Sequence, residues 1–188
     1  MGICQVSAAE AGSGVAPPPE LATDNIGFSD VLLDPDRVLR RHYLALDPAP
    51  ASLCKTHYAL SVQLALRYLA TKGIDLKYLP NDVWQLGKLT FAPLEAHSGG
   101  YQQIDPLGHQ ILLNYRATPN PIDIAPRVTL QQVLSGQIGA DTFKDRIVLI
   151  GTTAPMRTMI YRSLIRAIAI VGTSSMTKLI DRSRTNEI

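Results

Sequence analysis

Short β-prone runs alternate with two helical patterns between residues 26 and 151, and Asp, Asn, Gly or Pro residues separate them. Strands are typically short apolar or β-branched runs, whereas helices repeat apolar residues at intervals of three and four. Strands interleaved with helices predict an α/β domain, built as a mixed sheet with flanking helices. A chain of 188 residues is long enough for one such domain with a sizeable core.

The first half of this pattern contains a hairpin and the clearest helix. The runs VLL and VLRRHYLAL flank residues 34–37, DPDR, a sequence suited to a tight turn, and together they predict a β-hairpin. Apolar residues at helical spacing across residues 51–73 predict a helix. We expect Thr56 to cap its start and Gly73 to end it.

The second half consists mainly of shorter strands. LKYL, VWQLG and KLTFAPL predict three strands between residues 74 and 94, and two more are expected at 101–104 and 110–115. TLQQVLSGQIG predicts a short helix capped by Thr129. The apolar run at 147–150 predicts a strand that is buried on both faces.

Charge divides the chain near residue 155. Residues 1–155 carry 12 Lys and Arg against 14 Asp and Glu, whereas residues 156–188 carry 6 against 2. The basic excess therefore belongs to the tail, and the body gives no electrostatic reason to expect nucleic acid. The sequence shows neither a signal peptide nor an apolar run of membrane-spanning length. We therefore expect this chain, expressed as it stands, to be cytoplasmic.

The two cysteines, Cys4 and Cys54, do not have the spacing of a zinc site, and the four histidines are scattered. We expect two independent free thiols in this chain, because it shows no export signal. The alternative is one disulfide that closes a long loop, which requires export to an oxidising compartment.

No motif for catalysis or for a cofactor is found. The chain lacks GxGxxG, the phosphate loop GxxxxGK followed by Ser or Thr, and GxSxG. We therefore expect no enzyme activity and no cofactor.

Two polar groups of residues remain as candidates for binding. We expect the carboxylates Asp30, Asp34 and Asp36 to stabilise turns while nearby arginines neutralise them; the alternative is a hard cation such as calcium. The neutralising arginines are Arg37, Arg40 and Arg41. Asn114 and Arg116 alternate with Tyr115, so both point to one side of a strand end. They bind either neighbouring carboxylate and carbonyl groups, which we favour, or an anionic ligand.

Several stretches in order resemble one bacterial family. They are GFSDVLLDPDRVLRRHYLAL, the helix ALSVQLALRYL, ILLNYR, the helix VTLQQVLSG and FKDRIVLIGTTAP. Over residues 26–155 the chain is similar to the CHASE-type extracellular sensory domain, type two. The family usually has Gly where this chain has Arg37, so we expect the turn to avoid a left-handed conformation there.

The resemblance implies a signal-input domain that is not an enzyme. Such domains sit outside the cytoplasmic membrane, and transmembrane helices join them to cytoplasmic output modules; the small-molecule or other extracellular signal is unknown. The motif positions, with a role in the fold or in sensing, are Gly27, Phe28, Asp30, Asp34, Asp36, Arg40, Arg41, Asn114, Tyr115, Arg116, Gly151, Ala154 and Pro155.

The resemblance also divides the chain into three parts. Residues 1–25 are interpreted as a linker or the edge of a missing N-terminal part, and residues 26–155 as a partial sensory domain. The basic tail, 156–188, is interpreted as out of frame or disordered, since the family continues with an acidic loop that another reading frame can encode. The rival interpretation is a basic helix that lies on an anionic membrane.

The sequence thus predicts a fragment of an extracytoplasmic sensory domain from a membrane-anchored bacterial signal-transduction protein. The alternative is a stand-alone soluble α/β module that binds a small molecule.

Overall fold

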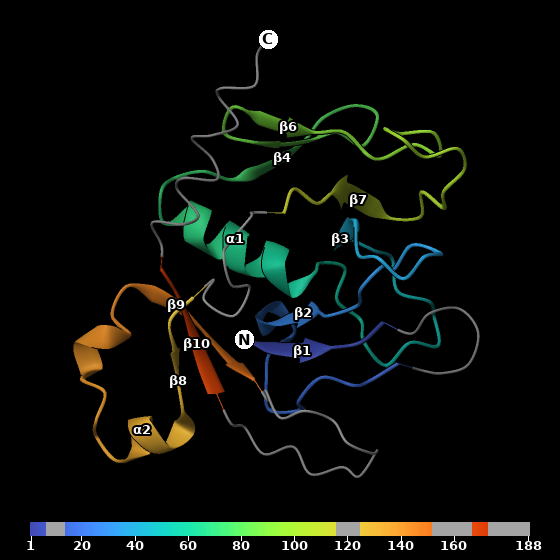
Figure 1. Ribbon diagram of the computed structural model, residues 1–188. Helices are drawn as coiled ribbons and strands as arrows, with labels where there is room; N and C mark the ends of the chain where they lie inside the picture. The colour runs from blue at the N-terminus through green and yellow to red at the C-terminus, as the bar shows by residue number, and fades with distance from the viewer. Residues whose placement is uncertain (7–13, 116–124, 152–166, 173–188) are drawn as a thin grey trace. The chain divides into compact units, whose positions relative to one another are not determined.

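The computed structural model describes residues 1–6, 14–115, 125–151 and 167–172 (Figure 1). The chain divides into two compact units, Met1–Tyr115 and Arg116–Ile188. Strands and a helix occur in each unit, so the chain has the predicted α/β fold. Its described strands form several small sheets rather than one continuous mixed sheet.

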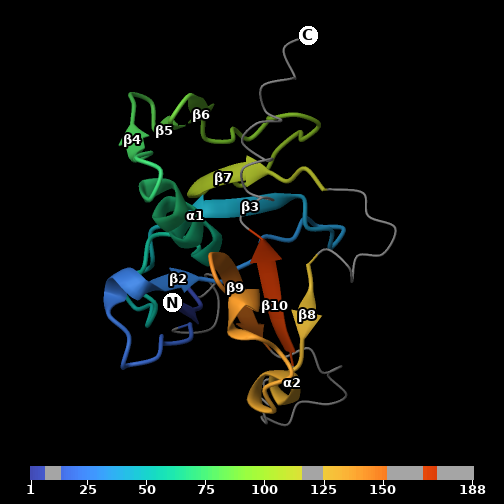
Figure 2. The same cartoon turned by 90° about the vertical axis from the view of Figure 1, so that its left-hand side faces the viewer.

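The first unit contains two pairs of strands that are far apart in the sequence and one meander of sequence neighbours. β1 runs parallel to β2, β3 runs antiparallel to β7, and β4, β5 and β6 form an antiparallel meander. The helix α1 lies beside β2 in both views (Figures 1 and 2). The described elements are β1 (Gly2–Cys4), the 3-10 turn η1 (Thr23–Asn25), β2 (Ile26–Phe28), β3 (Arg41–Ala45), α1 (Leu60–Ala70), β4 (Leu76–Tyr78), β5 (Trp84–Leu86), β6 (Leu89–Phe91) and β7 (His109–Leu112).

Helix α1 buries one face against the core. Val62 and Leu69 are buried, as their helical spacing predicts. Gly73 ends the helix as expected: its φ is +68°, and the following N–H, of Ile74, donates to the Leu69 carbonyl at 3.0 Å. Glycine adopts this left-handed conformation without the steric penalty of a Cβ atom.

The prediction that Thr56 caps this helix was wrong. The helix begins after Ala59, whose side chain offers no hydrogen bond, and the Thr56 hydroxyl instead donates to the Ile26 carbonyl at 3.0 Å. Thr56 is buried between the two segments. It therefore ties the approach to α1 onto β2 rather than capping the helix.

Gly27 allows β2 to lie directly against the start of α1. A Cβ atom at this position would lie 2.4 Å from the Leu60 Cα and 3.1 Å from the Ala59 carbonyl carbon. Both are backbone atoms, which cannot rotate away as the end of a flexible side chain can. Only glycine fits this contact.

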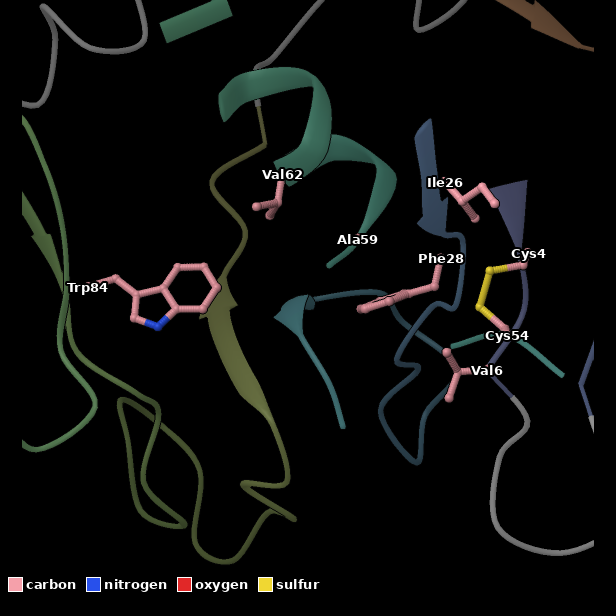
Figure 3. Close-up of a cluster of buried hydrophobic side chains, with 8 residues drawn as sticks. All are labelled: Cys4, Val6, Ile26, Phe28, Cys54, Ala59, Val62 and Trp84. Atoms are coloured by element: carbon pink, nitrogen blue, oxygen red, sulfur yellow. A yellow bond between two sulfur atoms is a disulfide. The ribbon is translucent and has the colours of Figure 1, made fainter. Parts of the chain in front are cut away.

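The core of the first unit extends from Trp84 at one end to a disulfide at the other (Figure 3). Trp84, the only tryptophan of the sequence, is 6% exposed and its ring stacks on His109 with 4.3 Å between centroids. Phe28 is 1% exposed and occupies the middle of the cluster. The buried members are Cys4, Val6, Ile26, Phe28, Cys54, Ala59, Val62 and Trp84.

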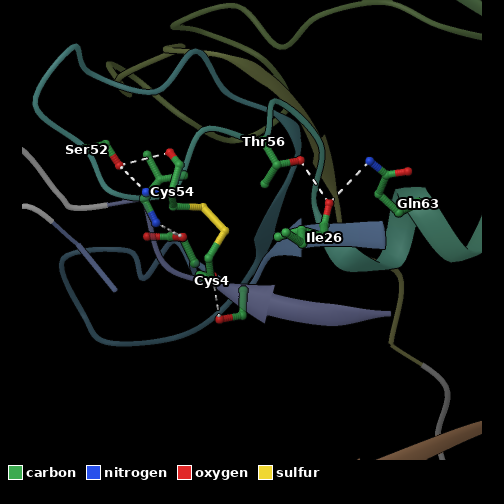
Figure 4. Close-up of a disulfide and its surroundings, with 9 residues drawn as sticks. Cys4, Ile26, Ser52, Cys54, Thr56 and Gln63 are labelled. Atoms are coloured by element: carbon green, nitrogen blue, oxygen red, sulfur yellow. Dashed lines mark hydrogen bonds between the residues drawn. A yellow bond between two sulfur atoms is a disulfide. The ribbon is translucent and has the colours of Figure 1, made fainter. Parts of the chain in front are cut away.

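Cys4 and Cys54 form a disulfide, so the expectation of two free thiols is corrected (Figure 4). The parallel pairing of β1 with β2 carries Cys4 to the loop before α1, where the two Cα atoms lie 5.5 Å apart. Disulfides form at such Cα separations. Sequence spacing alone could not reveal this proximity, since the two residues are 50 positions apart.

Of the hairpin predicted around residues 34–37, the turn forms but the two strands do not pair as a ladder. The Arg37 N–H donates to the Asp34 carbonyl at 2.8 Å, which confirms the turn, but Leu32 meets Arg41 only in an isolated bridge. β3 pairs instead with β7, and residues 101–104 form no strand. Arg37 has φ +63°, so the expectation that the turn avoids a left-handed conformation was wrong.

The meander of β4, β5 and β6 confirms the three strands predicted between residues 74 and 94. Asn81 and Asp82, with φ of +60° and +56°, make the tight turn between the first two. Both residue types tolerate the left-handed region better than most, so the local sequence specifies this turn.

The second unit has a short helix beside an antiparallel sheet with the strand order β8-β10-β9. Thr129 and Gln132 form the predicted cap of the helix, each side chain bonding to the other residue's backbone N–H. The expectation that residues 147–150 are buried on both faces was wrong, since Leu149 is 41% and Ile150 63% exposed. The described elements are β8 (Arg127–Val128), α2 (Leu130–Leu134), the 3-10 turn η3 (Ala140–Thr142), β9 (Arg146–Gly151) and β10 (Ala167–Gly172).

The interpretation of the tail stays a prediction. Within it the structure describes β10, which pairs along its whole length with β9. The remaining tail residues lie outside the described ranges.

Candidate functional site

The carboxylate of Asp34 is the centre of a buried charged cluster. It is 4% exposed and lies in the turn before β3. Its Oδ1 accepts from Nε of Arg41 and pairs with Nη2 of the same guanidinium, both at 3.0 Å. Its Oδ2 accepts from Arg40 Nη1 at 3.1 Å and from the Tyr101 hydroxyl at 2.7 Å. A buried carboxylate is tolerated in this way because donors surround it.

These contacts set the protonation state of Asp34. The hydrogen bond from Tyr101 lowers its pKa most, burial opposes this shift, and Arg40 and Arg41 lower the pKa further. Burial and the bond to Asp34 in turn raise the pKa of the Tyr101 hydroxyl. Asp34 is therefore charged and Tyr101 is neutral near pH 7.

Arg41 extends the cluster to β7. Its Nη1 donates to Gln110 Oε1 at 2.9 Å and to the Asp105 carbonyl at 3.4 Å, and its guanidinium carbon lies 5.3 Å from the centroid of the Tyr101 ring. Gln110, which is fully buried, donates onward to the carbonyls of Asp105 and Leu107 at 3.0 and 2.7 Å. The network joins β3, β7 and the turn before β7.

Arg40 and Asp36 form an outer, partly exposed ion pair next to the buried pair of Arg41 and Asp34. Arg40 Nη1 and Nη2 donate to the two Asp36 oxygens at 2.8 and 2.7 Å. The side chain of Arg40 is 46% exposed and that of Asp36 is 54% exposed. The bond from Arg40 lowers the pKa of Asp36 most, and the Val38 N–H adds to this effect. The two carboxylates likewise raise the pKa of Arg40. The arginines that neutralise the turn carboxylates are thus Arg40 and Arg41, not Arg37.

A pocket of about 540 Å³ opens beside the outer pair. The Tyr115 hydroxyl donates to the Leu39 carbonyl at 2.6 Å, which holds this ring at the rim. The lining residues combine an ion pair with apolar and aromatic side chains: Asp36, Arg40, Gly100, Tyr101, Leu112, Leu113 and Tyr115.

The motif residues predicted from the sequence divide among several places. Asp34, Asp36, Arg40, Arg41 and Tyr115 belong to the charged cluster or the pocket. Gly27 and Phe28 are core positions in β2. Asp30 accepts from the Val6 N–H at 2.7 Å and so holds the N-terminal strand. Asn114 is exposed, Gly151 ends β9, and Arg116, Ala154 and Pro155 lie outside the described residues.

Tyr101 and Gln110 belong to the cluster although sequence reasoning did not select them. For Gln110 a weak signal existed, since an uncharged polar residue directly precedes the apolar run at 111–113. Tyr101 gave no such signal, because it lies in an irregular segment far along the chain from Asp34.

Two other kinds of feature are absent from the described residues. No set of three or more His, Cys, Asp or Glu side chains there is arranged to hold a metal ion. No helix there has the length and apolar character needed to cross a bilayer.

Comparison with known proteins supplies the family. The family model of the CHASE2 domain matches residues 5–166, which is most of the chain. The match extends past both ends of the span, residues 26–155, that the motifs cover. No curated protein and no solved structure gives a significant match. The chain therefore belongs to the CHASE2 family of extracellular sensory domains.

Proposed function

We propose that this chain is the signal-input domain of a membrane-anchored bacterial signal-transduction protein, and that it acts outside the cytoplasm without catalysing a reaction. The family match over residues 5–166 carries the proposal. In this role the domain detects a small molecule or another extracellular signal. Transmembrane helices and a cytoplasmic output module of the full-length protein pass the signal on.

The disulfide supports a location outside the cytoplasm. Cys4 and Cys54 are 2% and 0% exposed, so the bond is part of the core. Structural disulfides of this kind persist in oxidising compartments and are rare in the cytosol. The chain is accordingly expected to reach its native state outside the reducing cytoplasm.

The chemistry of the charged cluster supports binding rather than catalysis. A general acid or base works best with a pKa near the operating pH. Asp34 and Asp36 instead have lowered pKa values, and both are held by arginine. The cluster is suited to fixing side chains around a pocket, not to moving protons near neutral pH.

The test is a ligand screen on the oxidised chain. Small molecules are tested for a rise in melting temperature, since a ligand that binds only the folded state stabilises it. Each stabilising molecule is then incubated with the protein and recovered for mass spectrometry. We expect at least one stabilising molecule, recovered unchanged. Chemical conversion of that molecule by the pure protein would contradict a non-catalytic role.

A further inference from the structure

Arg40 keeps one edge of its guanidinium group unused. An arginine has five N–H donors. Nη1 donates to Asp34 and Asp36, and Nη2 donates once to Asp36. No described residue accepts from Nε or from the second Nη2 hydrogen. These two donors lie side by side on one edge of a planar group, and such a pair matches the two oxygens of a carboxylate.

The two aspartates hold this edge in position. They fix the guanidinium at 3.1 Å from Asp34 and at 2.7 Å from Asp36, yet the Arg40 side chain remains 46% exposed. A ligand that binds here does not have to immobilise a flexible arginine. Such preorganisation lowers the entropic cost of binding.

The rest of the pocket offers an apolar surface. Tyr101 and Leu113 line it, and Leu112 and Tyr115 are 46% and 66% exposed. Its volume of about 540 Å³ is within the range typical of small-molecule sites. A ligand body that covers these side chains gains from apolar burial and from contact with the aromatic rings.

The charge of the cluster disfavours a ligand with more than one negative charge. Asp34 and Asp36 balance Arg40 and Arg41, so the site has no excess of positive charge. A dianion such as a phosphate monoester would lie close to two carboxylates and be repelled.

We propose that this pocket binds a small monocarboxylate with an apolar or aromatic body, through the Nε and Nη2 donors of Arg40. The inference rests on the proposed sensory function and names the chemical class of its ligand. The carboxylate lies on the guanidinium edge, and the body lies against Tyr101, Leu112 and Tyr115.

The experiment is a nuclear magnetic resonance titration of the oxidised chain, which follows the Nε–H signal of Arg40. The probes are 3-phenylpropionate and hexanoate, each paired with its amide, and phenyl phosphate as the dianion. We expect the carboxylates to shift this signal and to bind about tenfold or more tightly than their amides, as for a hydrogen-bonded charge pair. Phenyl phosphate should bind more weakly than 3-phenylpropionate.

Arg40→Lys tests the paired donors, because lysine keeps the charge but cannot form the two parallel bonds. We expect about a tenfold loss of affinity for 3-phenylpropionate. Arg67→Lys is the matched control: Arg67 binds the Asp24 carbonyl and Asn25, and it does not line the pocket. Should Arg40→Lys fail to fold, the comparison of acids with amides on the unchanged chain decides.

Equal affinity for acids and amides, an unaffected Arg40→Lys variant, or tighter binding of phenyl phosphate would each overturn the proposal. Absence of any binding by the two carboxylates would overturn it as well. If the screen still finds another ligand that is recovered unchanged, the sensory function stands without this pocket chemistry.

Discussion

At the scale of single residues, backbone geometry explains two positions that the family motif marks. Gly27 is needed because β2 touches the backbone of α1, and Arg37 occupies a conformation that suits glycine better. The motif could show that these positions matter. It could not show whether the reason was a ligand or the fold, because contact between distant segments is invisible in the sequence.

Gly27→Ala is expected to destabilise the first unit by about 3 kcal/mol, since an added methyl group must push apart two backbones in a packed region. Urea denaturation followed by Trp84 fluorescence measures the change. Gly100→Ala is the control, because a Cβ atom there meets nothing within 4 Å. It should alter the free energy of unfolding by no more than about 0.5 kcal/mol. If Gly27→Ala left the free energy of unfolding unchanged, β2 would not lie as close to the start of α1 as the structure has it.

Arg37→Gly is expected to stabilise the protein by about 1 kcal/mol, because it removes a left-handed conformation from a residue with a Cβ atom. The greater freedom of glycine in the unfolded chain offsets part of the gain. Arg37 is exposed, and its side chain makes no hydrogen bond or ion pair with the described residues that the change would remove. The reverse change, Gly87→Ala at φ +60°, should destabilise by a similar amount in the same urea assay.

At the scale of elements, local patterns were predictable and long-range pairings were not. The features that could be predicted depend on residues that lie close together in the sequence. They are helix α1, its end at Gly73, the meander of β4 to β6 and the capped helix α2. The pairings of β1 with β2 and of β3 with β7 join distant segments. A sequence pattern gives the period and length of a strand but does not name its partner.

The candidate site shows the same limit. Asp34, Asp36, Arg40 and Arg41 are close in sequence, so their mutual neutralisation could be predicted from the turn. Tyr101 reaches Asp34 across 67 positions, and Leu112 and Tyr115 join the pocket only because β7 pairs with β3. The ion pairs were thus foreseeable, and the pocket beside them was not.

The disulfide adds a covalent link to a short element that is otherwise held by β2, by the Asp30 side chain and by core packing. β1 has three residues and pairs only with β2 among the described strands. The double variant Cys4→Ala/Cys54→Ala is expected to lose about 2 to 4 kcal/mol of stability, since the bond closes a loop across 50 positions. Urea denaturation with and without reductant measures this loss. Reductant should weaken the unchanged chain by a similar amount and leave the double variant unaffected.

At the scale of the whole molecule, histidine and aspartate side chains both make the free energy of unfolding fall as the pH falls. Burial lowers the pKa values of His109 and His42, so below about pH 6.5 the unfolded state takes up protons that the folded state refuses. The lowered pKa values of Asp34 and Asp36 have the same sign at lower pH. Their contribution is present above the unfolded value of 3.8 and is lost as pH falls through the folded pKa.

The protein should therefore lose stability in two stages, one below about pH 6.5 and one below about pH 4. His109 belongs to the first, because its ring stacks on Trp84 and its Nε2 has no hydrogen-bond partner among the described residues. Asp82 partly opposes the effect of burial on the pKa of His109. His109→Phe keeps a ring against Trp84 and cannot titrate. Urea midpoints at pH 7.5, 5.5 and 3.5 should show a smaller first stage in this variant, with His42 responsible for what remains, and an unchanged second stage. An undiminished first stage would mean that His109 accepts a proton in the folded protein as readily as in the unfolded chain.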